Sequence, residues 1–255
     1  MPLPDSEKSI LLPWDSELFG FPVGLLGPES LDGVNLAEAL KHLKSEGVRL
    51  VYASPRWGDG MSRALLEGAG AVLVDHKMVF RKAGLLQGLT PEGVTLWPGS
   101  DCPPELEALA LTSGHLSRFR LDPRVPAHVF RELYSKWMQR SVRLEIADGV
   151  LVARMAGTIA GMVTLAIKGD RGRIGLLAVA DAYQGQGIGR RLIAASEAFC
   201  VSRGVHILEV ATQGANQGAC SLYGACGFAL ADEAAMYHIW IENCLPGFNA
   251  KPGCT

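Results

Sequence analysis

The sequence lacks the features that identify several classes of protein. Its formal net charge is −2 and its pI is about 6.3, so it has no strongly basic surface of the kind that binds nucleic acid. No apolar run approaches the ~20 residues that cross a bilayer, and the first residues include no basic leader. No Gly-Lys-Ser or Gly-Lys-Thr triplet occurs, which excludes a P-loop. We therefore expect neither nucleic acid nor a membrane among the partners.

The cysteines provide no metal-binding pattern. The six cysteines form no C-x-x-C pair, and their spacing to the six histidines fits no metal site, so we expect no metal. We interpret them as reduced, mostly buried thiols of a cytoplasmic protein. They are Cys102, Cys200, Cys220, Cys226, Cys244 and Cys254. We expect the tail after Leu245 to be disordered or peripheral.

The most informative stretch runs from Arg173 to Phe199. An apolar run ends at Val179, three alternating glycines follow, and a helical pattern then begins. The glycines are Gly185, Gly187 and Gly189; the apolar face of the helix contains Leu192, Ile193, Ser196, Phe199 and Cys200. Alternate glycines let the backbone approach a ligand, and a helix N-terminus offers N–H groups without partners. The pattern predicts a strand, a loop and a helix that bind a phosphate or pyrophosphate.

A dinucleotide-binding fold is the first alternative for this loop. Its G-x-G-x-x-G fingerprint does not fit, because the loop reads G-x-G-x-G and places Arg190 where the third glycine packs helix on strand. Glu209 does lie twenty residues beyond Gly189, where an acidic residue that binds ribose is expected. However, no second βαβ half follows, so this alternative is not favoured.

The second alternative is a resemblance. Gln184-Gly185-Gln186-Gly187-Ile188-Gly189 resembles the Q/R-x-x-G-x-G/A loop by which GNAT N-acetyltransferases hold the pyrophosphate of acetyl-CoA. One departure is Asp181, where many members carry proline. The resemblance implies acetyl-CoA as the cofactor. It also implies binding by Leu177, Ala178, Val179, Gln184, Gly185, Gln186, Gly187, Ile188, Gly189, Arg190, Asn216, Ala219 and Tyr223.

The order of elements extends this resemblance over residues 92 to 242. Apolar patterns predict strands near 94–97, 150–157, 160–168, 207–212 and 234–241, and helices near 104–113, 127–141, 188–200 and 216–227. The resemblance implies an α/β fold with a mixed sheet, the GNAT acyl-CoA N-acyltransferase fold. We expect this domain to occupy residues 89–255, after a partial GNAT-like αβ half-domain in residues 1–88.

The first half contains a degenerate repeat of the second. The segments EGVRLVYAS and RGVHILEVA match, as do ALLEGAGAVLV and SLYGACGFALA, both at an offset of 157 residues. Gly47 then matches Gly204, and Gly70 matches Gly227. We infer that residues 38–80 are a partial copy of the later helix-strand-helix-strand unit, without a pyrophosphate loop. Upstream of the copy, we interpret LLPWDSELFGFPVGLL as a turn rich in aromatics between short apolar runs.

The expected catalytic face lies on the second-last helix. Asn216, Ala219 and Tyr223 stand at i, i+3 and i+7 and share a face, although Asn216 is also a reasonable N-cap. The resemblance assigns to Tyr223 the phenol near the coenzyme sulfur. The general base stays open: Glu209, Asp15, Glu17 and His115 are candidates, and so is a water relay.

The acceptor is narrowed by a second resemblance. The stretches LLPWDSELFGFPV, RIGLLAV, LEVATQGANQGACSLYGACGFAL and MYHIW resemble the dTDP-fucosamine acetyltransferases, which implies a dTDP-linked amino-deoxysugar. Arginines suit its pyrophosphate, and aromatic rings suit thymine. The candidates are Arg118, Arg120 and Arg124, with Trp14, Phe19 or Phe21. An enzyme for another amine, such as a peptide N-terminus, a polyamine or an antibiotic, stays open, as do a non-catalytic acyl-CoA sensor and a homodimer.

Overall fold

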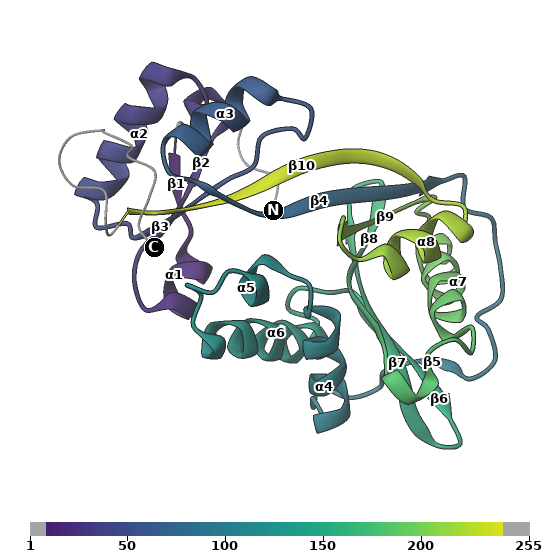
Figure 1. Ribbon diagram of the computed structural model, residues 1–255. Helices are drawn as coiled ribbons and strands as arrows, with labels where there is room; N and C mark the ends of the chain where they lie inside the picture. Colours follow the sequence, from purple (N-terminus) through teal and green to yellow (C-terminus); the bar gives the residue numbers. More distant parts are fainter. Residues whose placement is uncertain (1–8, 242–255) are drawn as a thin grey trace. The chain divides into compact units, whose positions relative to one another are not determined.

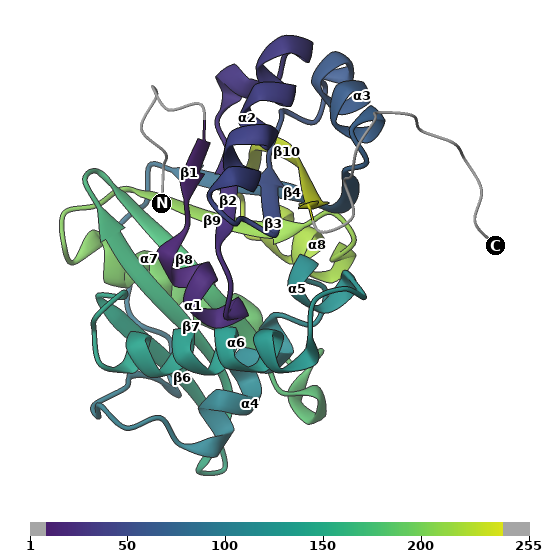
Figure 2. The same ribbon diagram turned by 90° about the vertical axis from the view of Figure 1, so that its left-hand side faces the viewer.

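The structure of the chain is a computed structural model that describes residues 9–241 (Figures 1 and 2). It divides into two compact units. The first combines the residues up to His76 with those from Glu233 onward, and the second runs from Lys77 to Asp232. Both units combine helices with a mixed sheet, which confirms the expected α/β class. Cys244, Cys254 and the tail after Leu245 lie outside the described residues. Within residues 9–241, no helix has both the length and the apolar character needed to span a bilayer.

In the second unit the strands have the order β4-β9-β8-β7-β6-β5. All neighbours are antiparallel except β8 and β9, which are parallel. The bounds are β4 Val72–Ala83, β5 Val94–Leu96, β6 Gly149–Met155, β7 Thr158–Lys168, β8 Arg171–Val179 and β9 Ile207–Gln213. Every residue of β7 from Ile159 to Leu165 is buried, as expected of a central strand with both faces covered.

Helices cover both faces of this sheet (Figure 1). On one face, a Cβ added to Gly172 would lie 2.3 Å from the Cys200 sulfur of α7, so β8 packs directly against this helix. On the other face, a Cβ on Gly175 would lie 3.6 Å from Nε1 of Trp137 in α6. The bounds are α4 Pro104–Ser113, α5 Arg118–Leu121, α6 Ala127–Val142, α7 Ile188–Val201 and α8 Gln217–Ala225, with a short 3-10 helix η2 at Asp181–Tyr183.

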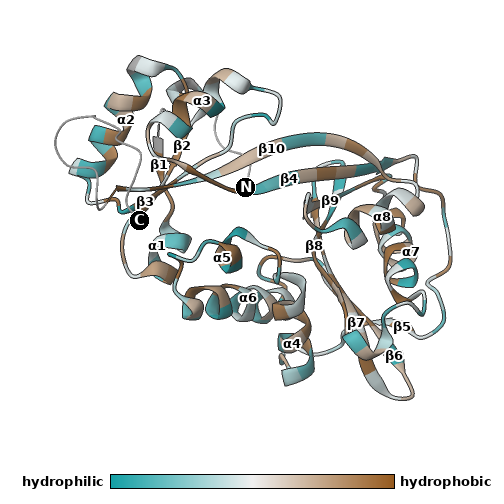
Figure 3. Ribbon diagram, in the orientation of Figure 1, coloured by the Kyte–Doolittle hydropathy of each residue, from teal (hydrophilic) through white to brown (hydrophobic). Residues whose placement is uncertain are grey.

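The predicted apolar face of α7 is confirmed. The ribbon of α7 alternates between hydrophobic and hydrophilic residues (Figure 3). Its five predicted face residues are all buried, and four belong to one hydrophobic core with Phe80 and Tyr223: Leu192, Ile193, Phe199 and Cys200. The fifth, Ser196, satisfies its hydroxyl by donating to the Leu192 carbonyl at 2.7 Å. This cluster therefore lies between α7, α8 and one face of the sheet, while buried residues of α4 and α6 belong to the other face.

The first unit has the strand order β1-β2-β3-β10. Its strands are β1 Ser9–Leu11, β2 Val23–Leu26, β3 Leu50–Ala53 and β10 Ala229–Trp240. Its helices are α1 Pro13–Phe19, α2 Gly33–Ser45 and α3 Gly60–Gly68, with the 3-10 helix η1 at Pro28–Ser30. The predicted turn around Trp14 is wrong, because a seven-residue helix lies there. Pro13 starts it with a preset φ, and Gly20 ends it with a φ of 71°.

The internal repeat expected from the sequence is present in the structure. α3 and α8 have the same length and are offset by 157 residues, and so are β4 and β10. Asp59 and Asn216 cap the two helices through their side chains. Gly70 and Gly227 follow the two helices with φ values of 83° and 84°. The two segments therefore share backbone conformation as well as sequence pattern.

The last strand of each copy pairs outside its own copy. β10 pairs antiparallel with β3, and Tyr237 faces Ala53; β4 pairs antiparallel with β9, and Phe80 faces Val210. At the offset of 157 residues, Ala53 corresponds to Val210 and Phe80 corresponds to Tyr237. The two strand pairs therefore have the same register. Each of the two long strands thus pairs with the other copy, which is an exchange of β4 and β10. The two compact units divide the chain after His76 and after Asp232, within these two strands.

Candidate active site

The parallel pairing of β8 with β9 stops early. Partners are Gly172 with Leu208, Arg173 with Glu209 and Ile174 with Val210. Beyond Ile174, no residue of β8 pairs with β9 among the described residues. Ligands of α/β proteins bind at the carboxyl ends of parallel strands, and here the facing backbone edges of two such ends are not paired with each other.

β8 carries a bulge at the point where this pairing stops. Between two paired positions, β7 advances from Val163 to Leu165, while β8 goes from Leu177 to Ile174, so β8 contains one extra residue. The Leu176 N–H donates to the Thr164 hydroxyl at 2.9 Å instead of to a carbonyl of β7. The bulge is accommodated by Gly175, since a Cβ there would lie 2.8 Å from Oγ1 of Thr164.

The three predicted residues after the bulge pair with β7 on one edge only. Leu177, Ala178 and Val179 face Val163, Met162 and Gly161 of β7. Consecutive N–H groups of a strand point to opposite edges, so at least one of these three amides points to the edge where β9 is not paired. This amide is available as a hydrogen-bond donor to a ligand.

The glycine-rich loop joins η2 to α7 in a left-handed conformation. Gly185 and Gly187 have φ values of 73° and 75°, and a Cβ on either would meet no atom within 4 Å. Glycine is needed at position 189 for close packing of two helices. A Cβ there would lie 2.9 Å from Leu222 of α8, so Gly189 allows α7 and α8 to pack closely. The first two glycines therefore leave open space, and the third serves packing.

The loop presents backbone donors without partners. The first paired amide of α7 belongs to Arg191, which donates to the Gly187 carbonyl at 3.1 Å. In the part of the chain that the structure describes, the amides from Gly185 to Arg190 make no hydrogen bond. The loop itself is held by the amide groups of two glutamines: Gln184 donates to Val179 O at 3.3 Å and to Asp181 at 2.9 Å, and Gln186 donates to Ala182 O at 3.3 Å.

Tyr223 lies in the core with its hydroxyl uncommitted. The residue is 4% exposed, and its ring centroid lies 5.7 Å from that of Phe80 and 5.9 Å from that of Phe228. Among residues 9–241, the hydroxyl has no hydrogen-bond partner, yet it is not one of the completely buried unpartnered atoms, so it keeps contact with solvent. Burial raises the pKa of Tyr223 well above its usual value, and this phenol stays protonated at neutral pH.

The other two residues of the predicted face have structural roles. Oδ1 of Asn216 accepts from the Ala219 N–H at 3.1 Å and caps α8, as its position allowed. Ala219 packs at the edge of the core that contains Tyr223.

The candidate bases differ widely in their surroundings. Glu209 accepts from Arg81 at 2.7 Å and from Arg171 at 2.9 Å, and Arg173 lies 3.6 Å away, so this carboxylate is committed to arginines. His115 is exposed, and its Nδ1 lies 2.7 Å from Thr112 O. Asp15 and Glu17 belong to α1 of the first unit, where Asp15 accepts from the Tyr52 hydroxyl at 3.1 Å.

The predicted acceptor residues are only partly available. Arg118 and Arg120 lie over the rings of Phe119 and Phe130, at 4.4 and 5.7 Å, and Arg124 pairs with Asp122 at 3.3 Å. In the first unit, Phe19 is buried against Phe21 and Trp240, with centroids 5.3 and 6.4 Å away, while Trp14 is half-buried. Phe19 is thus a core residue and does not offer a free stacking face.

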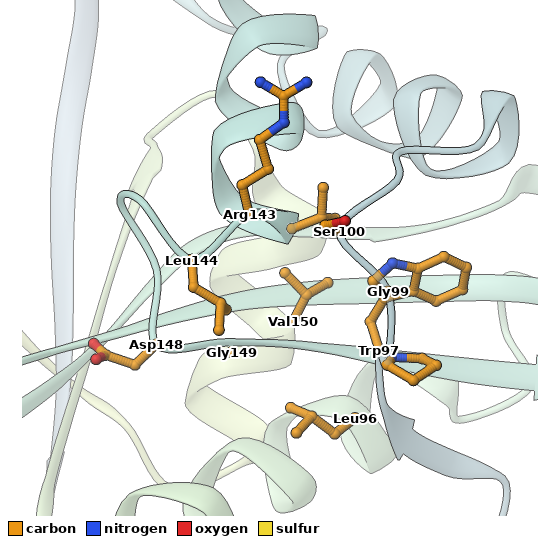
Figure 4. A pocket seen from close by; sticks show the side chains of 11 residues that line it. Leu96, Trp97, Gly99, Ser100, Arg143, Leu144, Asp148, Gly149 and Val150 are labelled. Carbon is orange, nitrogen blue, oxygen red and sulfur yellow. The ribbon is translucent and has the colours of Figure 1, made fainter.

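Two features were not found from the sequence. Arg81 of β4 and Arg171 and Arg173 of β8 surround Glu209 of β9, and the separation of these strands along the chain left no local signal. A cavity of about 250 Å³ lies at β5, the end of α6 and the start of β6, lined in part by Trp97, Leu144 and Val150 (Figure 4). Within the described chain, no predicted site residue lines this cavity.

Comparisons with known proteins find similarity within the second unit. The sequence profile of the Acetyltransferase (GNAT) family matches residues 118–228, which include β8, the glycine loop, α7 and α8. No curated protein matches the chain.

Several solved structures share the fold. A GCN5-related N-acetyltransferase from Sphaerobacter thermophilus has a TM-score of 0.61 and 15% identity, covering 95% of this chain and 79% of that one. One from Kribbella flavida has a TM-score of 0.58 and 16% identity, over 91% and 86%. A tandem GNAT protein from the clavulanic acid biosynthesis pathway has a TM-score of 0.55 and 16% identity, over 87% and 76%. Over residues 118–228 the chain is therefore similar in sequence to the GNAT acetyltransferase family, and it shares the fold of these solved structures.

Proposed function

We propose that the second unit is an N-acetyltransferase that uses acetyl-CoA. One observation carries the proposal: the amides from Gly185 to Arg190 have no partner within the described chain, at the N-terminus of α7. Successive N–H groups beside left-handed glycines form a concave donor surface, and the helix dipole adds partial positive charge. This surface fits a pyrophosphate, and any side chain at Gly185 or Gly187 would strain it. Acetyl-CoA supplies an acyl group activated as a thioester.

The chain supplies two groups for the reaction itself. An amide among Leu177, Ala178 and Val179, on the unpaired edge of β8, donates a hydrogen bond to the oxygen that gains charge during transfer. Tyr223 acts as the general acid, because its phenol is protonated and its hydroxyl has no other partner among residues 9–241. The remaining binding surface positions the amine, and positioning supplies much of the rate gain.

Acetyl transfer exchanges one bond at the acetyl carbon for another. A C–N bond forms at the acetyl carbon and the C–S bond breaks; the sulfur takes a proton from Tyr223. The amine loses its proton to water, since Glu209 is engaged in ion pairs with three arginines. Tyr223 regains its proton from solvent, with which its oxygen keeps contact.

For the acceptor we propose the amino group of a dTDP-linked amino-deoxysugar. The support is the sequence resemblance in four stretches and the presence of exposed arginines in the same unit, since guanidinium groups bind phosphate through paired hydrogen bonds. Of the arginines first considered, Arg120 keeps an exposed side chain and Arg118 is half-buried.

The test measures coenzyme A release from acetyl-CoA by the purified full chain. The acceptors are dTDP-4-amino and dTDP-3-amino sugars, free amino sugars, polyamines and peptides. Turnover confined to dTDP-linked sugars supports the whole proposal, and turnover with another amine keeps the reaction and replaces the acceptor. Tight binding of acetyl-CoA without any turnover would make the domain a sensor and would refute catalysis.

A further inference from the structure

Three arginines of the second unit surround a single carboxylate. Nε of Arg81 lies 2.7 Å and Nη1 of Arg171 2.9 Å from the same oxygen of Glu209, so these two guanidinium groups are immediate neighbours. Nε of Arg173 lies 3.6 Å from the other oxygen. The side chain of Glu209 is 8% exposed, while those of the three arginines are 38% to 40% exposed. The carboxylate is covered, and the guanidinium groups reach solvent.

The cluster carries more positive charge than it neutralises. Three guanidinium groups and one carboxylate leave a net charge of +2 within one patch. Asp170 lies 3.4 Å from Arg171, but its side chain is 75% exposed, where an ion pair contributes little. Lys168 faces Arg171 across β7 and β8 and adds a further cation. Cations held this close repel one another, so the patch is prepared for an anion.

The guanidinium N–H groups of Arg81 and Arg173 that make no hydrogen bond have a geometry suited to an oxyanion. Within the described chain, Arg81 donates to Glu209 only through Nε, and Nε of Arg173 has no hydrogen-bond partner. The terminal nitrogens of both arginines make no hydrogen bond with any described residue. A guanidinium edge offers paired N–H groups that match two oxygens of a phosphate or carboxylate. Two such edges, on the two strands that flank β9, fit a group with several oxygens.

The patch lies on the face of β8 that points away from α7. Gly172 faces α7, so Arg171 and Arg173 project from the opposite face of β8. Gly175 of the bulge also faces that side, toward Trp137 of α6. Arg173 precedes Gly175 by two residues, about 7 Å along a strand. A group bound to the patch is therefore close to the bulge, on the face away from the glycine loop.

We propose that Arg81, Arg171 and Arg173 bind an anionic group of the acceptor, a phosphate or pyrophosphate, and thereby hold its amine beside the β8 bulge. The assignment of the bound anion to the acceptor substrate rests on the proposed function, whereas the anion site itself does not. It replaces Arg118, Arg120 and Arg124 as the main anchor of the acceptor. Glu209 is a positioning residue that orients the three guanidinium groups.

The test is a calorimetric titration in two stages with the full-length protein. The first stage adds coenzyme A until the glycine loop is saturated; the second adds inorganic pyrophosphate as the probe. We expect the wild type to bind pyrophosphate in the second stage, and Arg81→Gln and Arg173→Gln to weaken that binding at least about tenfold each, as the loss of a charged hydrogen bond does. Affinity for coenzyme A should stay unchanged in both variants.

Two matched variants control for charge and folding. Arg203→Gln removes an exposed arginine that stacks on Phe199 at 3.5 Å, and it should leave pyrophosphate binding unchanged. Arg173→Lys keeps the ion pair with Glu209 and should retain most of the binding, and thermal unfolding of each variant reports its fold. Equal pyrophosphate affinity in the wild type, Arg81→Gln and Arg173→Gln would overturn the proposal, and so would no binding at millimolar probe.

The outcome is distinguishable from failure of the proposed function. A protein that takes up no coenzyme A, yet binds pyrophosphate in an Arg173-dependent way, keeps the anion site and loses the acetyltransferase. A protein that binds coenzyme A and turns over amines, but binds no pyrophosphate through these arginines, keeps the reaction and loses the anion site. If the protein has both the acetyltransferase activity and the anion site, Arg173→Gln should raise the acceptor KM and leave the acetyl-CoA KM unchanged.

Discussion

Replacing Tyr223 by phenylalanine removes one hydroxyl and tests its role directly. A buried hydroxyl with a hydrogen bond contributes about 0.5–1.5 kcal/mol to stability. The Tyr223 hydroxyl has no such partner among the described residues, so the free energy of unfolding should change by less than about 0.5 kcal/mol. Loss of a general acid should lower kcat about 100-fold or more. Stability follows from thermal unfolding, and kcat follows from coenzyme A release.

Tyr237 provides a matched control in the first unit. It is fully buried, but its hydroxyl donates to Glu67 at 2.6 Å and accepts from Arg63 at 3.3 Å. Tyr237→Phe should therefore lose about 1–3 kcal/mol of stability and keep its kcat. The two variants are expected to behave in opposite ways. Unchanged kcat in Tyr223→Phe refutes the assignment of the proton donor, and a stability loss as large as that of Tyr237→Phe refutes the claim that its hydroxyl is uncommitted.

Three further predictions concern the loop, the core and pH. Gly187→Ala and Gly70→Ala both place a side chain at positive φ in open space, so each should lower the free energy of unfolding by about 1–2 kcal/mol. Only Gly187→Ala should weaken coenzyme A binding. Equal coenzyme A affinity in the two variants would disprove the assignment of the loop. Leu192→Ala, at a fully buried site, should lose about 2–5 kcal/mol, whereas Leu89→Ala, 94% exposed, should change stability by less than about 0.5 kcal/mol. Because burial raises the pKa of Tyr223, its contribution is complete below the unfolded pKa of about 10 and is lost as pH rises above it, so the wild type should lose more stability than Tyr223→Phe between pH 9 and 11.

Local patterns allowed much of the second unit to be predicted. The apolar face of α7 repeats with the helical period, and Asn216 marks the start of α8 because its side chain caps the helix. The positive φ values at Gly185 and Gly187 follow from the same residues that suggested the loop. These features depend on neighbours in sequence, so the sequence reveals them.

Features that depend on distant segments were not predicted. Glu209 looked like a candidate base, and only the pairing of β9 with β4 and β8 surrounds it with three arginines. Phe19 was predicted to stack on a ligand, but Trp240, more than two hundred residues later in the sequence, packs against its ring. The helix α1 was missed because a seven-residue segment with three aromatic or proline residues has weak helical character of its own.

The exchange of β4 and β10 affects how the chain can fold during synthesis. Ala53 faces Tyr237 in the finished sheet, and β10 does not begin until Ala229. At about 5–20 residues per second, β3 emerges roughly 10 to 35 seconds before its antiparallel partner exists. Its free edge, with Val51 and Ala53, is exposed to other nascent chains for that interval. A chain that ended before Ala229 would retain every residue of the proposed site and still lack the strand that completes the other unit.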